Sequence, residues 1–188
     1  VYQGGTQKTL DTCVSKCADY EQVFSRTSKN SELYQINQIE ALYLTVVEQA
    51  MDLKDSFTKK RSYTKEQCES IVKQIEQKKT KENTVKYSIR QDGSITFEIS
   101  ALLERIVKKG LEYSKKSDGR FDIAIEPVSS LWDFTVKKPT VPDEQKIEKA
   151  LAYVDYQKIA LDDQKLTFQM PGMGIDLGGI AKGFIADE

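Results

Sequence analysis

Near the end of the sequence, a carboxylate, two glycines and a lysine follow one another in a spacing that suits phosphate chemistry. An apolar stretch that predicts a strand ends at Asp176, Gly178 and Gly179 predict a turn, and Lys182 lies one turn into a predicted helix. Glycines let a phosphate approach bare backbone N–H groups, and a lysine near a helix N-terminus adds positive potential. Two readings stay open: a phosphate site, or a plain connection in which Asp176 caps the helix. The spacing matches neither a Walker loop nor a dinucleotide fingerprint.

A second group of residues that could do chemistry lies between residues 119 and 133. Asp122 and Glu126 stand in an apolar stretch that has no sustained period. Each has a structural alternative, Asp122 as the cap of a turn beside a buried strand and Glu126 as a carboxylate in a salt bridge. Trp132 is the single tryptophan, and its large ring predicts a core or interface anchor.

The composition excludes several kinds of chemistry. The 188 residues include no histidine, so the chain itself holds no Ser-His-Asp triad, Cys-His dyad, HExxH zinc site or imidazole base. With 28 Lys+Arg against 29 Asp+Glu, the net charge of -1 argues against a nucleic-acid partner. Any chemistry must therefore use carboxylates, lysine, backbone groups or a cofactor.

The three cysteines do not have the spacing of a zinc site or a CxxC pair. Cys13 and Cys17 share the apolar face of a helix predicted over about residues 6–24, together with Leu10 and Phe24. Free cysteines are among the most buried residues. We therefore expect both to lie in the core.

Residues 40–93 differ in character from the rest of the chain. A short helix is predicted from Ser31 to just before Asn37, and a helical period resumes at Leu42. Between Lys59 and Lys81 there are 8 basic and 3 acidic residues. The region predicts a helical hairpin that is polar over most of its surface. It is either a solvated insertion or a docking surface for an acidic partner or an anionic membrane.

The remaining pattern alternates short strands with helices and predicts an α+β fold, a mixed or antiparallel sheet flanked by helices. A turn at residues 91–94 precedes a strand over 94–98, and Ser100 caps a helix that Gly119 can end. Pro142 suits the first turn of a helix reaching about Val154. Residues 158–161 and 166–170 predict a β-hairpin.

Four motifs in order resemble one family. They are Tyr20-Glu-x-x-Phe-Ser-Arg with Ser31-Glu-Leu-x-x-Ile-Asn, Ser117-Asp-Gly-x-Phe-Asp-Ile, Glu126-Pro-x-x-x-Leu-Trp-x-Phe, and Asp176-Leu-Gly-Gly-Ile-Ala-Lys-Gly-x-x-Ala-Asp. Each alone is weak, but together they cover almost the whole chain outside residues 40–93. The sequence resembles the ApbE family of flavin transferases, which implies an ApbE-like, T-fold-like domain.

The resemblance implies an activity and its partners. A member would cleave FAD at the pyrophosphate, attach FMN through a phosphoester to a Thr or Ser hydroxyl of an acceptor flavoprotein, and release AMP. Mg²⁺ would neutralise the pyrophosphate, consistent with phosphoryl transfer in general. Two alternatives are hydrolysis of FAD to FMN and AMP, and an FAD-binding or partner-docking module without catalysis.

The family's site residues carry over onto positions of this chain that match its motifs. The residues expected against FAD are Phe97, Arg120, Phe121, Asp122, Asp176 and Lys182. Backbone carbonyls of the turn near the helix start are expected to contact the metal, at Gly179 or Ala181. No residue of the chain matches a catalytic base.

The sequence departs from the family in two ways. About fifty residues intervene where the family has a short loop, and the family continues well past the final helix. We therefore expect this chain to be the N-terminal part of a flavin transferase that does not flavinylate alone. The resemblance also implies an extracytoplasmic, lipid-anchored protein, and the start at Val1 without Met suggests that any leader or anchor has been removed. No apolar run approaches the ~20 residues that cross a bilayer.

Overall fold

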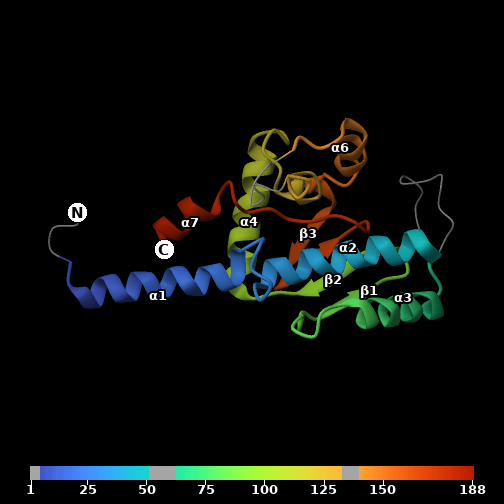
Figure 1. Ribbon diagram of the computed structural model, residues 1–188, viewed down its shortest axis with the longest axis horizontal. Coiled ribbons are helices and arrows are strands. Elements are labelled where there is room, and N and C mark those ends of the chain that lie inside the picture. The colour runs from blue at the N-terminus through green and yellow to red at the C-terminus, as the bar shows by residue number, and fades with distance from the viewer. Residues whose placement is uncertain (1–4, 51–61, 133–139) are drawn as a thin grey trace.

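A four-stranded antiparallel sheet lies at the centre of the computed structural model, which describes residues 5–50, 62–132 and 140–188 (Figure 1). In sheet order, the strands are β1 (Tyr87–Ile89), β2 (Ile95–Glu98), β4 (Lys165–Phe168) and β3 (Ile159–Asp162). The central β2–β4 pair joins segments about seventy residues apart in the chain. This arrangement confirms the predicted α+β fold.

Each half of the sheet is a hairpin whose residues fit the pairing. The predicted β3–β4 hairpin is confirmed, and Asp163 and Gln164 at its turn have φ of 42° and 56°. Such positive φ at both turn residues matches the twist of the flanking strands. In the central pair, Thr96 lies opposite Thr167 and their hydroxyls are 2.9 Å apart.

Helix α1 (Gln7–Phe24) begins at the N-cap Thr6 and buries only its last turns. Tyr20 and Phe24 pack in the core, whereas Cys13 and Cys17 are exposed. The prediction that these cysteines are buried is therefore wrong. The N-terminal half of the helix projects beyond the other described elements (Figure 1). No described residue therefore covers Cys13 and Cys17, although the helix has the expected apolar face.

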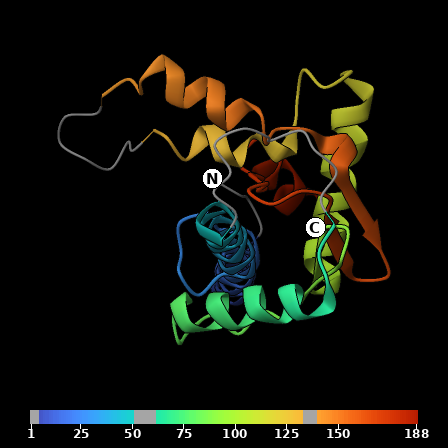
Figure 2. The ribbon, with the colours of Figure 1, turned by 90° about the vertical axis from the view of Figure 1, so that its right-hand side faces the viewer.

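Helix α2 (Glu32–Ala50) runs without a break through Asn37, where the sequence predicted an end. Its second half carries Tyr43, Val46 and Val47, all fully buried. Helix α3 (Lys65–Lys78) lies across the end of α2 and buries Ile71 and Ile75 (Figure 2). A solvated insertion is therefore wrong for these faces, since they form part of the core.

The same region also contains β1, which the predicted helical hairpin did not include. β1 pairs with β2, and Tyr87 lies opposite Phe97 in that pair. The Tyr87 hydroxyl donates to Glu76 of α3 over 2.9 Å, so strand and helix are tied together. Whether residues 40–93 are an insertion relative to the family stays a prediction.

Helix α4 (Ala101–Lys116) confirms the helix predicted after Ser100. The Ser100 hydroxyl caps it by accepting from the Leu103 N–H, and the Glu32 carboxylate accepts from both the backbone N–H and the hydroxyl of Ser100. The shorter helices are η1 (Ile123–Ile125), α5 (Glu126–Ser129), α6 (Glu144–Leu151), η2 (Tyr156–Lys158) and α7 (Ala181–Asp187). In the described ranges, no helix has both the length and the apolar character needed to cross a membrane.

The sequence predicts a strand over residues 172–176, but these residues pair with no strand in the described sheet. Side chains of α2 hold them instead. The Asn37 amide donates to the Ile175 carbonyl over 2.9 Å and accepts from the Ile175 N–H over 3.0 Å. The Glu40 carboxylate accepts from the Gly172 N–H over 3.0 Å. These buried bonds replace the ladder that a strand partner would supply.

Replacing Asn37 by Ala removes both bonds and leaves the N–H and C=O of Ile175 buried without partners. We expect Asn37→Ala to lower the free energy of unfolding by about 2–4 kcal/mol, measured by urea denaturation. Asn30→Ala is the control, because Asn30 is exposed and should change it by less than about 0.5 kcal/mol. Equal effects of the two variants would contradict the role of Asn37.

Candidate functional site

Five of the eight residues predicted at the site line one cleft of about 610 Å³. They are Arg120, Phe121, Asp122, Asp176 and Gly179. The cleft lies between the loop after α4, the turn before α7 and the end of α6. Its volume falls in the range of ligand sites, ~300–1,000 Å³. Apolar side chains complete the lining: Ile125, Leu151 and Val154.

The loop after α4 is shaped by its backbone and by one carboxylate. Asp118 and Gly119 have φ of 53° and 75°, which turns the chain back at the helix end. Asp122 accepts from the Ala124 N–H over 2.7 Å and from the Tyr156 N–H over 3.0 Å. Both of its oxygens are thus engaged, and the structural alternative, a turn cap, describes how Asp122 is held.

Asp176 is held by three groups from different parts of the chain. Its Oδ2 accepts from the Ser129 hydroxyl over 2.7 Å and lies 3.3 Å from Arg26 Nε, and its Oδ1 accepts from the Gly178 N–H over 2.9 Å. The side chain is 19% exposed. The carboxylate therefore has a fixed orientation at the edge of the cleft.

A glycine is needed at position 179 because the Phe121 ring lies against its backbone. A Cβ there would come within 2.9 Å of Phe121 Cε2. That separation is too short for real contacts, so a side chain would displace the ring. The structure thereby links the two predicted motifs: the aromatic residue of the first packs on the glycine turn of the second.

The structure does not bring the other three predicted residues to this cleft. Placing Phe97 against a flavin is wrong, because its side chain is fully buried in the sheet, 5.9 Å from the Phe168 ring. Lys182 is exposed on α7 and does not line the cleft. Ala181 opens α7, where its carbonyl accepts from the helix itself.

The described residues supply few ligands for Mg²⁺. No group of three or more His, Cys, Asp or Glu in the described ranges could hold a metal ion. Magnesium prefers oxygen ligands in octahedral geometry. Two carbonyls were predicted to contact the metal, those of Gly179 and Ala181. Only the Gly179 carbonyl lies outside a helix, and it accepts no backbone hydrogen bond from the described residues. One carbonyl does not make a metal site, so the described residues do not fit Mg²⁺ by themselves.

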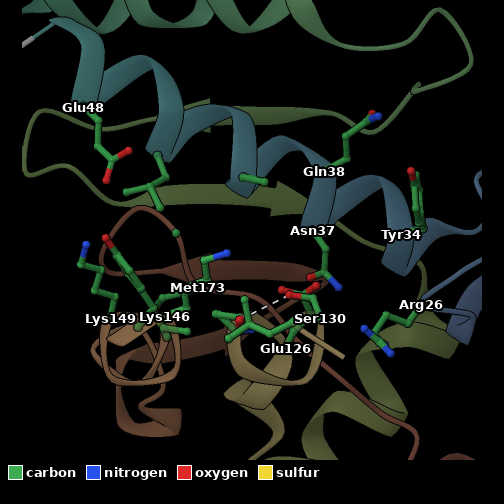
Figure 3. Close-up of a pocket in the computed structure, with 17 residues that line it drawn as sticks. Arg26, Tyr34, Asn37, Gln38, Glu48, Glu126, Ser130, Lys146, Lys149 and Met173 are labelled. Carbon is green, nitrogen blue, oxygen red and sulfur yellow. Dashed lines mark hydrogen bonds between the residues drawn. The ribbon is translucent and has the colours of Figure 1, made fainter. Parts of the chain in front are cut away.

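Sequence reasoning missed Arg26 and misjudged Glu126, which line a second cleft of about 640 Å³ (Figure 3). Arg26 ends the motif Tyr20-Glu-x-x-Phe-Ser-Arg, and its place in that motif could have marked it as a site residue. Glu126 forms no ion pair in the described ranges, so the predicted salt bridge is wrong. Burial raises the pKa of its carboxyl to about 7; nearby Arg26 lowers it and Asp176 raises it further.

Because the folded pKa of Glu126 is above its ordinary 4.5, folding favours the protonated form. Its contribution is present at low pH and is lost as pH rises toward and through 7. Between about pH 5 and pH 8 we expect Glu126 to lower the free energy of unfolding by roughly 2–3 kcal/mol. Glu126→Gln should remove that part of the pH dependence.

The direct measurement is the ¹³C shift of the Glu126 carboxyl, which should titrate with a midpoint of about 7. Burial also raises the pKa of Glu40, so a second carboxyl signal can shift in the titration. The signal of Glu126 is therefore identified by its absence from the spectra of Glu126→Gln. A carboxyl midpoint below about 5 would contradict the buried placement of Glu126.

Comparisons with known proteins identify the family of this chain. Residues 42–188 match the model of the ApbE family. The FAD:protein FMN transferase of Haemophilus influenzae is 28% identical over 143 residues, 71% of this chain and 41% of that protein. The enzyme of the same name from Treponema pallidum is 30% identical over 105 residues, 52% of this chain and 29% of that protein. The chain thus spans less than half the length of these relatives.

Solved structures show the same fold. The flavin transferase ApbE of Vibrio cholerae superposes with a TM-score of 0.60 at 17% identity, covering 100% of this chain and 45% of that one. The ApbE protein of Thermotoga maritima also gives 0.60, at 20% identity and 45% of its chain. The sequence match, which covers most of the chain, and this shared fold show that the chain belongs to the ApbE family.

Proposed function

We propose that this chain forms the FAD-binding part of an FAD:protein FMN transferase. Membership of the ApbE family and the names of its relatives support this function. The observation that carries the proposal is the gathering of Arg120, Phe121, Asp122, Asp176 and Gly179 around one cleft. Two separate motifs supply them, and only the fold unites the two.

The chemistry of the cleft suits a dinucleotide with a flavin. Arg120 is exposed at the rim, where a guanidinium can pair with phosphate oxygens. Phe121 offers a ring that is only half-buried, and Ile125, Leu151 and Val154 offer apolar surface for a heterocycle. The fixed carboxylate of Asp176 adds an acceptor for a ring N–H or hydroxyl.

In the proposed reaction, a Thr or Ser hydroxyl of an acceptor flavoprotein attacks the phosphorus on the FMN side of FAD. A new P–O bond forms to the hydroxyl oxygen, the pyrophosphate P–O bond breaks, and AMP leaves. The hydroxyl proton must pass to a base. Mg²⁺ belongs to the proposal only as a partner of the pyrophosphate, with the Gly179 carbonyl as the contact that this chain could offer.

One observation favours the alternative that this chain alone binds without catalysing. Both carboxylates of the cleft are already engaged, Asp122 by two backbone N–H groups and Asp176 by Ser129, Arg26 and Gly178. These bonds hold both carboxylates in place. The described ranges contain no group of three or more His, Cys, Asp or Glu that could hold a metal ion, so the Mg²⁺ that phosphoryl transfer uses would need ligands beyond them.

The proposed location is extracytoplasmic, with a lipid anchor in the native protein, by resemblance to the family. Fractionation of the native cells, with an antibody to this chain, tests the location. Recovery in the membrane fraction, with sensitivity to an extracellular protease, would support it, and recovery only with cytoplasmic markers would count against it.

Gly179→Ala should displace the Phe121 ring and weaken FAD binding at least about fivefold, since a Cβ there overlaps the ring. Quenching of flavin fluorescence measures the affinity. The matched control is Gly183→Ala in α7, where an added Cβ meets nothing within 4 Å. Its affinity should stay within about twofold of wild type. Equal losses in both variants would mean that the ring does not form the site.

Incubation of this chain with FAD, Mg²⁺ and a Thr-bearing acceptor protein should yield no covalent flavin, because the described residues do not form a Mg²⁺ site by themselves. In-gel flavin fluorescence under denaturing conditions gives the readout. The positive control is a native flavin transferase that carries the rest of the family's length. A fluorescent acceptor band with this chain alone would overturn this limit.

A further inference from the structure

The larger cleft, of about 640 Å³, lies between α2 and the α5–α6 pair (Figure 3). It shares no lining residue with the nucleotide cleft described above. The two lie on opposite sides of one wall: Glu126 lines the larger cleft while the adjacent Ile125 lines the other. Arg26 reaches from the larger cleft to Asp176 at the edge of the smaller one.

The larger cleft presents a carboxylate and a guanidinium whose bonding capacity the described residues leave wholly or partly unused. No hydrogen bond or ion pair of the described residues involves the Glu126 carboxylate, although burial in this cleft raises its pKa to about 7. Arg26 uses its Nε on Asp176, and no bond in the described part of the chain uses its two Nη groups. Both side chains are partly exposed, so water can reach these groups now and a ligand in the cleft could replace it.

An acceptor and donors in one cleft match a peptide backbone. A peptide carbonyl can accept from the Arg26 guanidinium, and a peptide N–H can donate to the Glu126 carboxylate. An extended segment presents both groups along one edge, which is how backbone recognition usually gives affinity. A phosphate or simple carboxylate would satisfy Arg26 but would place a second anion beside Glu126.

The walls and rim suit the side chains of such a segment. Leu44, Met173 and the Tyr153 ring give apolar surface within the cleft. At one end, Lys146 and Lys149 lie three residues apart on α6 and form no ion pair in the described ranges. Glu48 of α2 lies at the same end, where the two lysines outnumber it (Figure 3). Side chains at that spacing share a helix face, so the pair favours an acidic residue.

We propose that this cleft docks an extended, acidic segment of the acceptor protein, with its backbone on Arg26 and Glu126 and an acidic side chain on Lys146 and Lys149. The inference rests on the proposed transferase function, because it identifies the polypeptide as the acceptor. Docking here would place the acceptor beside Arg26, which pairs with Asp176 at the edge of the nucleotide cleft.

The test is an NMR titration of the ¹⁵N-labelled chain with a capped hexapeptide that carries one leucine between two aspartates. We expect saturable shifts that cluster at α5, α6 and Met173, with weak affinity, on the order of 1 mM or tighter. Lys146→Glu with Lys149→Glu should weaken binding at least about tenfold. The control is Lys73→Glu with Lys81→Glu, which makes the same charge change on exposed residues elsewhere. Its affinity for the peptide should stay within about twofold of wild type.

Two further peptides separate backbone docking from simple charge attraction. N-methylation of the leucine amide removes the N–H for Glu126 and should weaken binding several-fold, about fivefold or more. Replacing both aspartates by lysines should abolish it. Equal affinity for all three peptides, equal losses in the two double variants, or no shifts at about 5 mM peptide would each overturn the proposal.

FAD binding, measured on the same samples, keeps the two proposals distinguishable. The Lys146/Lys149 variant should bind FAD like wild type, because neither lysine lines the nucleotide cleft. Peptide binding without FAD binding would contradict the proposed function and leave a peptide site. FAD binding without peptide binding would contradict only the docking.

Discussion

Asn37 and Glu40 of α2 hold the backbone of residues 171–177 through three buried hydrogen bonds, and both clefts depend on this contact. Asn37 occupies both polar groups of Ile175, as a neighbouring strand would. In a low-dielectric interior such bonds are costly to lose, because the freed groups cannot reach water. The next residue is Asp176, so the helix side chains fix where its carboxylate meets Arg26 and Ser129.

The clefts are two faces of a single wall built from η1, α5 and α6. On one face, a glycine turn and the Phe121 ring make room for a nucleotide. On the other face, the Glu126 carboxylate and the two Nη groups of Arg26 form no bond with any described residue. Asp176 connects the faces, since it borders the nucleotide cleft and pairs with the Arg26 side chain. The arrangement would bring a bound nucleotide and a docked polypeptide to the two members of one ion pair, the nucleotide to Asp176 and the polypeptide to Arg26.

The sequence predicted what local patterns decide and missed what tertiary contacts decide. The β3–β4 turn, the Ser100 cap and the glycine turn are local, and the structure has them. Whether Cys13 and Cys17 are buried depends on another element that covers them, and the periodicity of their own helix does not reveal one; the structure leaves both exposed. The segment before Asp176 has a strand's composition but takes its hydrogen bonds from side chains, and Phe97 faces the core because of its register with β4.

The most direct measurement of the central claim is a map of amide shifts in the ¹⁵N-labelled chain on titration with FAD, which detects even weak binding. The account predicts that the shifts concentrate at residues 119–122 and 176–179, on the nucleotide side of the wall. Two results would contradict the assignment of the nucleotide site. One is that the shifts concentrate in the cleft lined by Arg26 and Glu126, and the other is that saturating FAD causes no localised shifts.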